Sequence, residues 1–396
     1  MIVELTILLG SSLLAFYTGY FLLLFTKSQN AETPNEITET RFTPSISVVV
    51  PTYNEEDTIV QKLTNLIEQD YPSIELIVVD SASKDRTVKL IKEFVKDNNL
   101  NVRLVRQRER KGKASALNLV FEKYCSGEIV VITDADAVWG KNALRKLVSS
   151  FSDSSVGAVT GKQVLLNPNQ NLMTGFEKTY RSIFDILRIG ETRIDSTPIF
   201  NGPLMAFRSS LLEPIPEDTI ADDSHLAVEV RKKGLRSVYN SNASFYEYAP
   251  PTPRSRFAQK LRRAHGLVQL FLRQRGMLFN RKYGKYGMVI FPAEFFMHVV
   301  SPVLLVAFLA CLFYSLFLIC FTLATPSIVI LVSIVAISLV ALAIKGSSFT
   351  NFILTFLDSQ FILLIALLYH LTGKSQHKWE KVPEIGKLWR ESKPSA

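Results

Sequence analysis

Two aspartates, Asp134 and Asp136, stand two residues apart at the end of the apolar run EIVVIT. On an extended strand end, residues two apart project to the same side, so these two carboxylates converge. Converging carboxylates repel each other unless a cation lies between them. Mg²⁺ or Mn²⁺ suits such a pair, especially when diphosphate oxygens complete the coordination shell. The DxD pattern after a buried strand therefore predicts a divalent cation site that also binds a diphosphate.

A basic run, RKGK, occupies residues 110–113 just before a predicted helix. Its glycine permits close approach of the backbone, and Lys113 supplies positive charge for a phosphate. The spacing differs from that of a P-loop, which needs GxxxxGK followed by Ser or Thr. A solvated surface charge is the alternative role for Lys111 and Lys113.

A second pair of aspartates, Asp222 and Asp223, opens a predicted amphipathic helix that continues to Lys233. A paired Asp at a helix start is usually an N-cap, and we expect Asp222 to be one. Asp223 could instead be a general base that takes the proton from an acceptor hydroxyl. The local pattern alone leaves both roles open for Asp223.

The hydrophobic pattern predicts the scaffold that gathers these residues. Short β-branched runs alternate with segments of helical period, which is typical of βα units and of an α/β fold with a mostly parallel sheet. Ligands bind at the carboxyl ends of such strands, where PTYNEE, DSASKDRT and DAD are found. In the first helix, Ile59, Leu63, Leu66 and Ile67 are expected on the buried face. The predicted strands are 45–50, 74–80, 102–105 and 128–133, and the predicted helices are 58–69, 87–97 and 114–124.

The composition indicates a membrane protein. Of 396 residues, 47% are hydrophobic and only 20% are charged, which excludes a disordered chain. Three cysteines without a CxxC pair exclude a disulfide scaffold and a cysteine-based zinc site. Residues 5–25 are long enough to cross a bilayer and lack the basic start of a signal peptide, so we expect a retained anchor. Three further apolar runs are residues 299–324, 326–344 and 352–371.

The excess of positive charge, +9 overall, is juxtamembrane. Residues 252–287 hold ten basic residues and no acidic one, immediately before an apolar run. This favours an integral plasma-membrane protein with several spans and a cytoplasmic catalytic domain, and it disfavours nucleic acid as a partner. Three C-terminal spans would place the tail outside, yet its basic character favours the inside. Either the last run, which contains Asp358, does not fully cross or the tail is an exception.

Six segments are therefore expected along the chain. They are a transmembrane anchor (1–26), a linker (27–44), an α/β domain (45–250), basic interfacial helices (251–291), a region of about three spans (292–372) and a basic tail (373–396).

The order of the motifs resembles a known family. PTYNEE, VVDSASKDRT, RKGKASALN and TDAD look like the nucleotide-sugar half of inverting family 2 glycosyltransferases with the GT-A fold. NGPLMAFR, ADDSHL and QKLRR look like the second half of membrane-integrated members, namely hyaluronan, poly-N-acetylglucosamine and cellulose synthases. The likeness covers about residues 45–266 and the flanking spans. Ceramide glucosyltransferases, which have a lipid acceptor, are a more distant likeness.

The resemblance implies a role for each matched residue. It makes Asp223 the base that activates the acceptor, and it makes Asp136 a firmer metal ligand than Asp134. The donor would be a UDP-sugar, and the cofactor would be Mg²⁺ or Mn²⁺. Residues implied for the donor are Tyr53, Glu55, Asp80, Lys113, Asp134, Gln259 and Arg262, and those implied for the acceptor are Gly202, Pro203 and Asp222.

Two departures from the family pattern bear on the acceptor. The usual DDGSTDGT reads DSASKDRT, and the usual QxxRW reads QxxRR, with Arg263 in place of the tryptophan that supports a growing polymer. We expect a processive synthase that passes its glycan to or through the membrane. The alternative is a single transfer to a membrane lipid, such as a polyprenyl phosphate or a sphingolipid-like acceptor. A remoter alternative is a non-catalytic nucleotide-binding membrane protein or a transporter.

Overall fold

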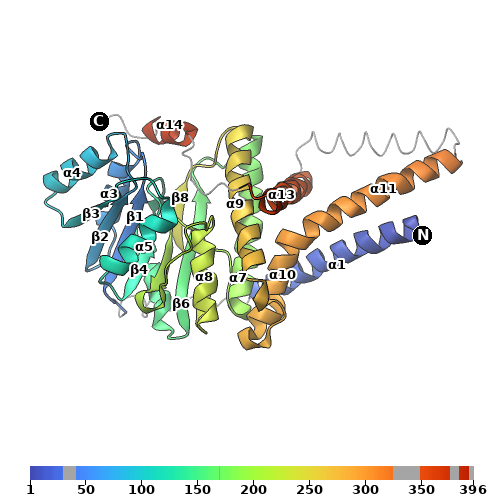
Figure 1. Cartoon of the computed structure of the whole chain (residues 1–396), viewed down its shortest axis with the longest axis horizontal. Helices are drawn as coiled ribbons and strands as arrows, with labels where there is room; N and C mark the ends of the chain where they lie inside the picture. The colour runs from blue at the N-terminus through green and yellow to red at the C-terminus, as the bar shows by residue number, and fades with distance from the viewer. Residues whose placement is uncertain (30–41, 169, 324–347, 375–382, 392–396) are drawn as a thin grey trace.

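The computed structural model describes residues 1–29, 42–168, 170–323, 348–374 and 383–391. An α/β domain built on one eight-stranded sheet lies at one end of the molecule, and long apolar helices extend from the other end (Figure 1). The sheet order is β3-β2-β1-β4-β7-β6-β8-β5.

The first half of the sheet is parallel, as predicted. β1 lies between β2 and β4, and β3 pairs with β2, all in parallel register. The observed bounds agree with the predicted ones within two residues. The strands are β1 (Ile46–Thr52), β2 (Ile74–Asp80), β3 (Val102–Arg106) and β4 (Ile129–Ile132), and the helices are α3 (Ile59–Ile67), α4 (Thr87–Asp97) and α5 (Lys113–Lys123).

Helix α3 buries a lysine whose burial the apolar pattern does not predict. Ile59, Leu63 and Leu66 are buried as expected, but Ile67 is 42% exposed. Lys62 takes the remaining place on the buried face with 1% of its side chain exposed. It lies three residues after Ile59, so helical geometry puts both on one face. The prediction that Ile67 lies on the buried face is therefore wrong, and Lys62 is buried on that face instead.

The second half of the sheet mixes strand directions, which the sequence pattern did not predict. β7 pairs antiparallel with both β4 and β6, β8 runs parallel to β6, and β5 pairs antiparallel with β8. Polar residues interrupt the longest of these strands, so no clean alternation marks it. The elements are β5 (Val138–Trp139), β6 (Val156–Leu165), β7 (Met205–Arg208), β8 (Arg236–Glu247), α6 (Ala143–Ser149), α7 (Leu172–Ile194) and α8 (Asp222–Lys232).

Within the described residues, three helical segments are long and apolar enough to cross a membrane: Ile2–Gln29, Tyr286–Ile319 and Phe352–Leu371. The predicted run 326–344 and most of the predicted linker lie outside the described residues. The basic stretch forms an amphipathic helix against the domain. The helices of this part are α1 (Ile2–Gln29), α9 (Pro253–Arg273), α10 (Phe291–Phe295), α11 (Ser301–Leu323), α13 (Ser348–Leu371) and α14 (Pro383–Glu391).

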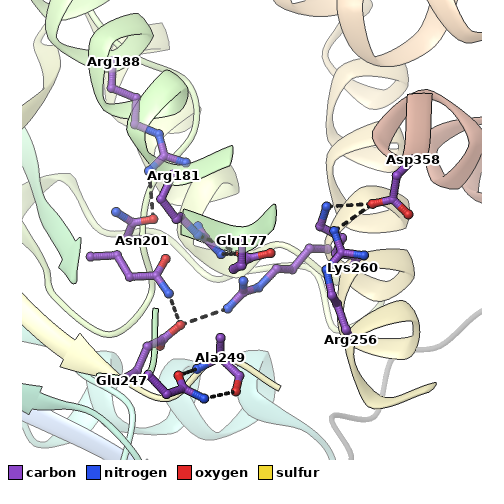
Figure 2. Close-up of polar contacts among 12 residues, drawn as sticks. Glu177, Arg181, Arg188, Asn201, Glu247, Ala249, Arg256, Lys260 and Asp358 are labelled. Atoms are coloured by element: carbon purple, nitrogen blue, oxygen red, sulfur yellow. Dashed lines mark hydrogen bonds and ion pairs between the residues drawn. The ribbon is translucent and has the colours of Figure 1, made fainter. Parts of the chain in front are cut away.

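The acidic residue in the last apolar run has basic partners on α9. Asp358 of α13 accepts hydrogen bonds from Arg256 at 2.8 Å and from Lys260 at 3.0 Å (Figure 2). A carboxylate in an apolar helix is tolerated when it is paired in this way. Because both partners belong to the basic amphipathic helix, α13 is held alongside α9.

The described part of the C-terminal tail packs on the α/β domain. Trp389 of α14 is 3% exposed and meets the ring of Tyr248 edge to face, with 4.9 Å between ring centroids. Arg390 forms an ion pair with Asp57 at 3.3 Å. These contacts put α14 on the same side of the molecule as the sheet (Figure 1).

Candidate active site

The turn before β7 brings the site together. An ideal Cβ on Gly202 would lie 3.3 Å from Nζ of Lys113 and 3.5 Å from the nearest carboxylate oxygens of Asp134 and of Asp223. Any side chain at this position would fill the space on which the three groups converge. The neighbouring carbonyl of Pro203 is fixed by hydrogen bonds from Thr133 and from the indole of Trp139, both at 2.8 Å. Glycine thus keeps the centre of the site open.

Lys113, the first residue of α5, is the central cation. Its Nζ donates to Oδ1 of Asp134 at 2.8 Å and lies 3.3 Å from Oδ2 of Asp222. Burial alone would lower the pKa of Lys113, but the nearby carboxylates outweigh it and raise the pKa above its usual value. Burial alone would raise the pKa of Asp134, but Lys113 holds it below the usual value. Lys113 is thus an internal partner of the DxD pair, and the surface-charge alternative for it is wrong.

Asp222 does not cap helix α8, so that prediction is wrong. The N-cap residue is Ala221, no side chain caps the helix, and Asp222 points to Lys113 instead. Asp223, the next residue, accepts a hydrogen bond from the backbone N–H of Ser224 at 2.7 Å. Burial, followed by the charge of Asp222, raises the pKa of Asp223 to about 6. A carboxylate with such a pKa can accept a proton near neutral pH.

The residues predicted for the base and ribose of a donor gather at the other end of the cavity. The guanidinium of Arg110 lies 3.9 Å from the ring centroid of Tyr53. Glu55 is 2% exposed and accepts a hydrogen bond from Thr58 at 2.8 Å. Both Tyr53 and Glu55 line the cavity.

Asp80 is the one predicted donor residue that does not line this cavity, whereas the next residue, Ser81, does. Asp80 is fully buried at the end of β2, and its Oδ2 accepts from the backbone N–H of Ser83 at 3.2 Å. Its Oδ1 is buried with no hydrogen-bond partner among the described residues. A small rearrangement of the loop after β2 would be needed for Asp80 to touch a ligand.

Helix α9 supplies Gln259 and Arg262, which line the cavity opposite α5. Burial, with the adjacent charge of Arg263, lowers the pKa of Arg262, while Asp222 and Asp134 oppose this effect. Arg263 itself forms an ion pair with Glu247 at 3.4 Å. In the QxxRR box, Arg262 therefore lies near Asp134 and Asp222, whereas Arg263 contacts Glu247 of β8.

The residues present fit a divalent cation only in part. Asp134 and Asp136 both line the cavity, and Gly202 leaves room beside Asp134. No group of three or more His, Cys, Asp or Glu residues in the described ranges can hold a metal ion. Two carboxylates would therefore hold the ion, and diphosphate oxygens and water would complete its shell, as Mg²⁺ and Mn²⁺ commonly require.

Sequence reasoning missed Lys62, which lies behind the DxD turn. Its Nζ donates to the carbonyl of Ala137 at 2.8 Å and lies 4.5 Å from the ring centroid of Trp139. Burial lowers the pKa of Lys62 to about 7, although Asp134 and Asp136 oppose this effect. The sequence signal that could have identified Lys62 is its position three residues after Ile59, on the buried face of the predicted helix.

One continuous cavity of about 1070 Å³ joins Lys113, Asp134, Asp136 and Asp223 to the apolar helices. It begins at Tyr53 and Arg110, passes Asp223, and ends among side chains of α1, α7 and α13. Glu177 and Arg181 of α7, and Glu247 of β8, line its middle part (Figure 2). Sequence analysis named none of these three residues, because neither α7 nor β8 was predicted.

Comparisons with known proteins agree with this architecture. Residues 47–215 match the family described as Glycosyl transferase family 2. A probable glycosyltransferase, YdaM, from Bacillus subtilis (strain 168) is 29% identical over 69% of this chain and 68% of its own length. A poly-beta-1,6-N-acetyl-D-glucosamine synthase from Staphylococcus aureus (strain MSSA476) is 28% identical over 58% of this chain, but the match covers only 56% of that synthase.

A solved structure extends the likeness to nearly the whole chain. The mannosyltransferase PcManGT from Pyrobaculum calidifontis, in complex with GDP-Man and Mn²⁺, is 30% identical. The likeness covers 95% of this chain and all of that one, with a TM-score of 0.75. The mixed sheet and these likenesses together lead to one conclusion: the chain belongs to glycosyl transferase family 2 and has the GT-A fold.

Proposed function

We propose that this glycosyltransferase moves a sugar from a nucleoside diphosphate sugar to an acceptor hydroxyl with inversion of configuration. The convergence of Asp134, Lys113 and Asp223 on Gly202 carries this proposal. It places a candidate base and a candidate diphosphate site within a few ångströms of one small space. An in-line displacement needs this arrangement, because leaving group and attacking group lie on opposite sides of one carbon.

The donor we propose is a UDP-sugar. Tyr53 and Glu55, which line the cavity, would bind the base, and Asp80 would reach the ribose after the loop that follows β2 rearranges. The diphosphate would lie between Lys113 and the two α9 residues Gln259 and Arg262. A mannosyltransferase of similar structure was solved with GDP-Man, so GDP-Man belongs in any donor screen.

The chain's own residues would carry the chemistry as follows. Asp223 takes the proton of the attacking hydroxyl while the oxygen bonds to the anomeric carbon, and the bond from that carbon to the diphosphate breaks. Lys113 and Arg262 hold positive charge where the leaving diphosphate gains negative charge. A divalent ion held by Asp134 and Asp136 would neutralise more of that charge. No second carboxylate nucleophile is needed for an inverting displacement.

Two acceptor classes remain. Similarity to a poly-beta-1,6-N-acetyl-D-glucosamine synthase favours a growing polysaccharide that passes to or through the membrane. The pairing of Arg263 with Glu247 favours a single transfer to a lipid, because no aromatic ring supports a polymer at this position. The non-catalytic alternative gains no support, since every acidic residue that the displacement needs is present.

The proposed location is an integral membrane protein with the α/β domain in the cytoplasm. The basic helix α9 supports this orientation through the positive-inside rule. Three candidate spans support membrane integration.

The test is the substitution Asp223→Asn. We expect nucleotide affinity to stay within about twofold while turnover falls by about 10²–10⁴, the usual contribution of a general base. Release of nucleoside diphosphate from UDP-Glc, UDP-GlcNAc, UDP-GlcA, UDP-Gal and GDP-Man with Mn²⁺ measures turnover. Asp218→Asn is the matched control, because Asp218 lies five residues away and pairs with Arg273 at the surface. Weakened nucleotide binding with turnover retained would refute the assignment.

A further inference from the structure

Beyond Asp223, the side chains that line the cavity are mostly apolar. Its far end is lined by Thr18 and Phe21 of α1 and by Phe352 and Phe356 of α13. Phe352 is 45% exposed on the outer surface of a helix that is apolar enough to meet lipid. One space therefore connects the candidate base to a surface that would contact acyl chains.

α1 and α13 also touch within this region. The ring centroids of Tyr17 and Phe356 lie 4.9 Å apart, and Gln360 donates to the hydroxyl of Tyr17 at 2.9 Å. Tyr17 in turn shares a hydrogen bond with Ser301 of α11 at 2.7 Å. This contact fixes the two helices on either side of the apolar end of the cavity.

A buried arginine lies between the apolar end and the candidate base. Arg188 of α7 is 5% exposed and lines the cavity. Its Nη1 donates to Oδ1 of Asn201 at 2.9 Å, and Asn201 directly precedes Gly202 (Figure 2). Its Nε is buried and has no hydrogen-bond partner among the described residues. A buried donor without a partner is costly, so a ligand oxygen at this point would be favourable.

The neighbouring acids form no close ion pair with Arg188 in the described ranges, although the charge of Arg188 acts on Glu294. Glu191 and Glu294 hydrogen-bond to each other, and Glu191 also accepts from Tyr20 at 2.9 Å. In the described ranges, neither acid forms an ion pair with Arg188 within 4 Å. Elsewhere in the middle of the cavity the charges are matched: Arg181 pairs with Glu177, Arg263 with Glu247 and Lys260 with Asp358. Arg188 and Arg262 remain as the positive charges available to an anion.

We propose that the acceptor is a membrane lipid whose head group carries both a phosphate and a free hydroxyl. The chain would lie between α1 and α13, the phosphate at Arg188 and the hydroxyl at Asp223. The hydroxyl oxygen bonds to the anomeric carbon, its proton goes to Asp223, and the nucleoside diphosphate leaves. This inference rests on the proposed function, which supplies the donor and the base.

Purified full-length protein in vesicles of two compositions tests the proposal. One set contains the total polar lipids of the membranes from which the protein is purified. The other contains the same lipids after an anion exchanger has removed the anionic fraction. With a radiolabelled donor, we expect label in the chloroform-soluble fraction only with the complete lipids. Release of nucleoside diphosphate to water is recorded in parallel as a measure of donor-site function.

Substitutions at Arg188 test the phosphate contact. We expect Arg188→Gln to lower lipid labelling by about tenfold or more, the value of one charge-assisted hydrogen bond, while donor hydrolysis is retained. Arg188→Lys keeps the charge and should recover part of the labelling. A purely structural role would lower donor hydrolysis and lipid labelling together in both variants.

Substitutions on α1 test the route of the chain. Thr18→Trp adds bulk inside the cavity, and Leu23→Trp adds the same bulk on α1 at a position that does not line it. We expect lipid labelling to fall in the first variant only.

Each of the other experimental outcomes contradicts one part of the proposal. Equal lipid labelling after removal of the anionic lipids would overturn the proposal that the acceptor lipid carries a phosphate. A water-soluble ladder of products, or donor hydrolysis without any lipid labelling, overturns the lipid acceptor. Absence of both hydrolysis and transfer across the donor panel overturns the proposed function itself.

Discussion

The side chain of Lys113 joins the two acidic loops of the site. Its Nζ lies 2.8 Å from Oδ1 of Asp134, in the DxD turn, and 3.3 Å from Oδ2 of Asp222, at the start of α8. One ammonium group therefore links the proposed donor half and the proposed acceptor half of the cavity. The two carboxylates, of which Asp222 is the more buried and Asp134 is half-buried, depend on this cation for compensation.

Replacing Lys113 should uncouple the two halves. We expect Lys113→Met to reduce turnover by about 10²–10³, because it removes charge at the leaving diphosphate and leaves Asp134 and Asp222 without their cation. Steady-state release of nucleoside diphosphate measures the loss. Lys111→Met is the matched control, since Lys111 is exposed and pairs with Glu109 at 3.2 Å. Equal rates in the wild type and Lys113→Met would contradict the assignment.

The pKa of Asp223 predicts an acid limb in the pH–rate profile. A general base acts only when deprotonated, so turnover should rise with pH, reach half of its maximum near pH 6 and level off about one unit above that. After burial, Asp222 is the largest cause of the raised pKa. Asp222→Asn should therefore move the limb to lower pH, whatever it does to the maximal rate. A limb that stays in place or moves up in pH would show that Asp223 is not the titrating base.

Removal of Asp136 should weaken metal binding before any chemistry is considered. Because Asp136 is one of the two proposed metal ligands, we expect Asp136→Ala to lower Mn²⁺ affinity in the presence of UDP by at least tenfold. Electron paramagnetic resonance of free Mn²⁺ measures this without turnover. Asp70→Ala, at an exposed residue that pairs with Arg145, should leave the affinity unchanged. Unchanged Mn²⁺ binding in Asp136→Ala would remove this residue from the metal site.

Asp358 should stabilise the packing of α13 on α9. Asp358→Asn leaves the buried Arg256 and Lys260 without a carboxylate, and we expect a loss of about 2–4 kcal/mol in the free energy of unfolding. Thermal unfolding in detergent measures it. Glu93→Gln breaks an exposed pair with Lys89 and should cost less than about 1 kcal/mol. A loss no larger than that of the control would mean that the pairing contributes little.

The contacts of α14 predict the side of the tail. Because Arg390 pairs with Asp57 of the α/β domain, the tail should lie on the same side of the membrane as that domain. A cysteine at the exposed Lys387, in a background without native cysteines, should resist an impermeant maleimide in intact cells and react in inside-out vesicles. Glu93→Cys on the domain is the control for that side. Labelling of the two cysteines in opposite preparations would place the tail outside.

The sequence by itself determined the parallel half of the sheet and the motifs at its edge. Strand 74–80 is rich in β-branched residues and mostly buried, and turn residues follow it, so local pattern was enough. Asp134 and Asp136 could be placed at this edge of the sheet for the same reason, but β4 ends at Ile132, so the turn that follows, and not the strand, sets the direction of their side chains. The family likeness then supplied Asp223, Gly202 and Arg262, which no local pattern could distinguish from caps, turns and surface charge.

Only the tertiary structure decided which charges meet. Asp222 is a helix-start aspartate in the sequence, yet it faces Lys113 from an element 109 positions further along the chain. Lys62, Arg188 and Glu247 become cavity or core residues only when α3, α7 and β8 pack against the site. From the sequence alone, Asp358 leaves it open whether the apolar run 352–371 crosses the membrane. The structure shows that Arg256 and Lys260 of α9 pair with this carboxylate. Pairing of buried charges depends on distance in space, and periodicity along the chain carries no information about it.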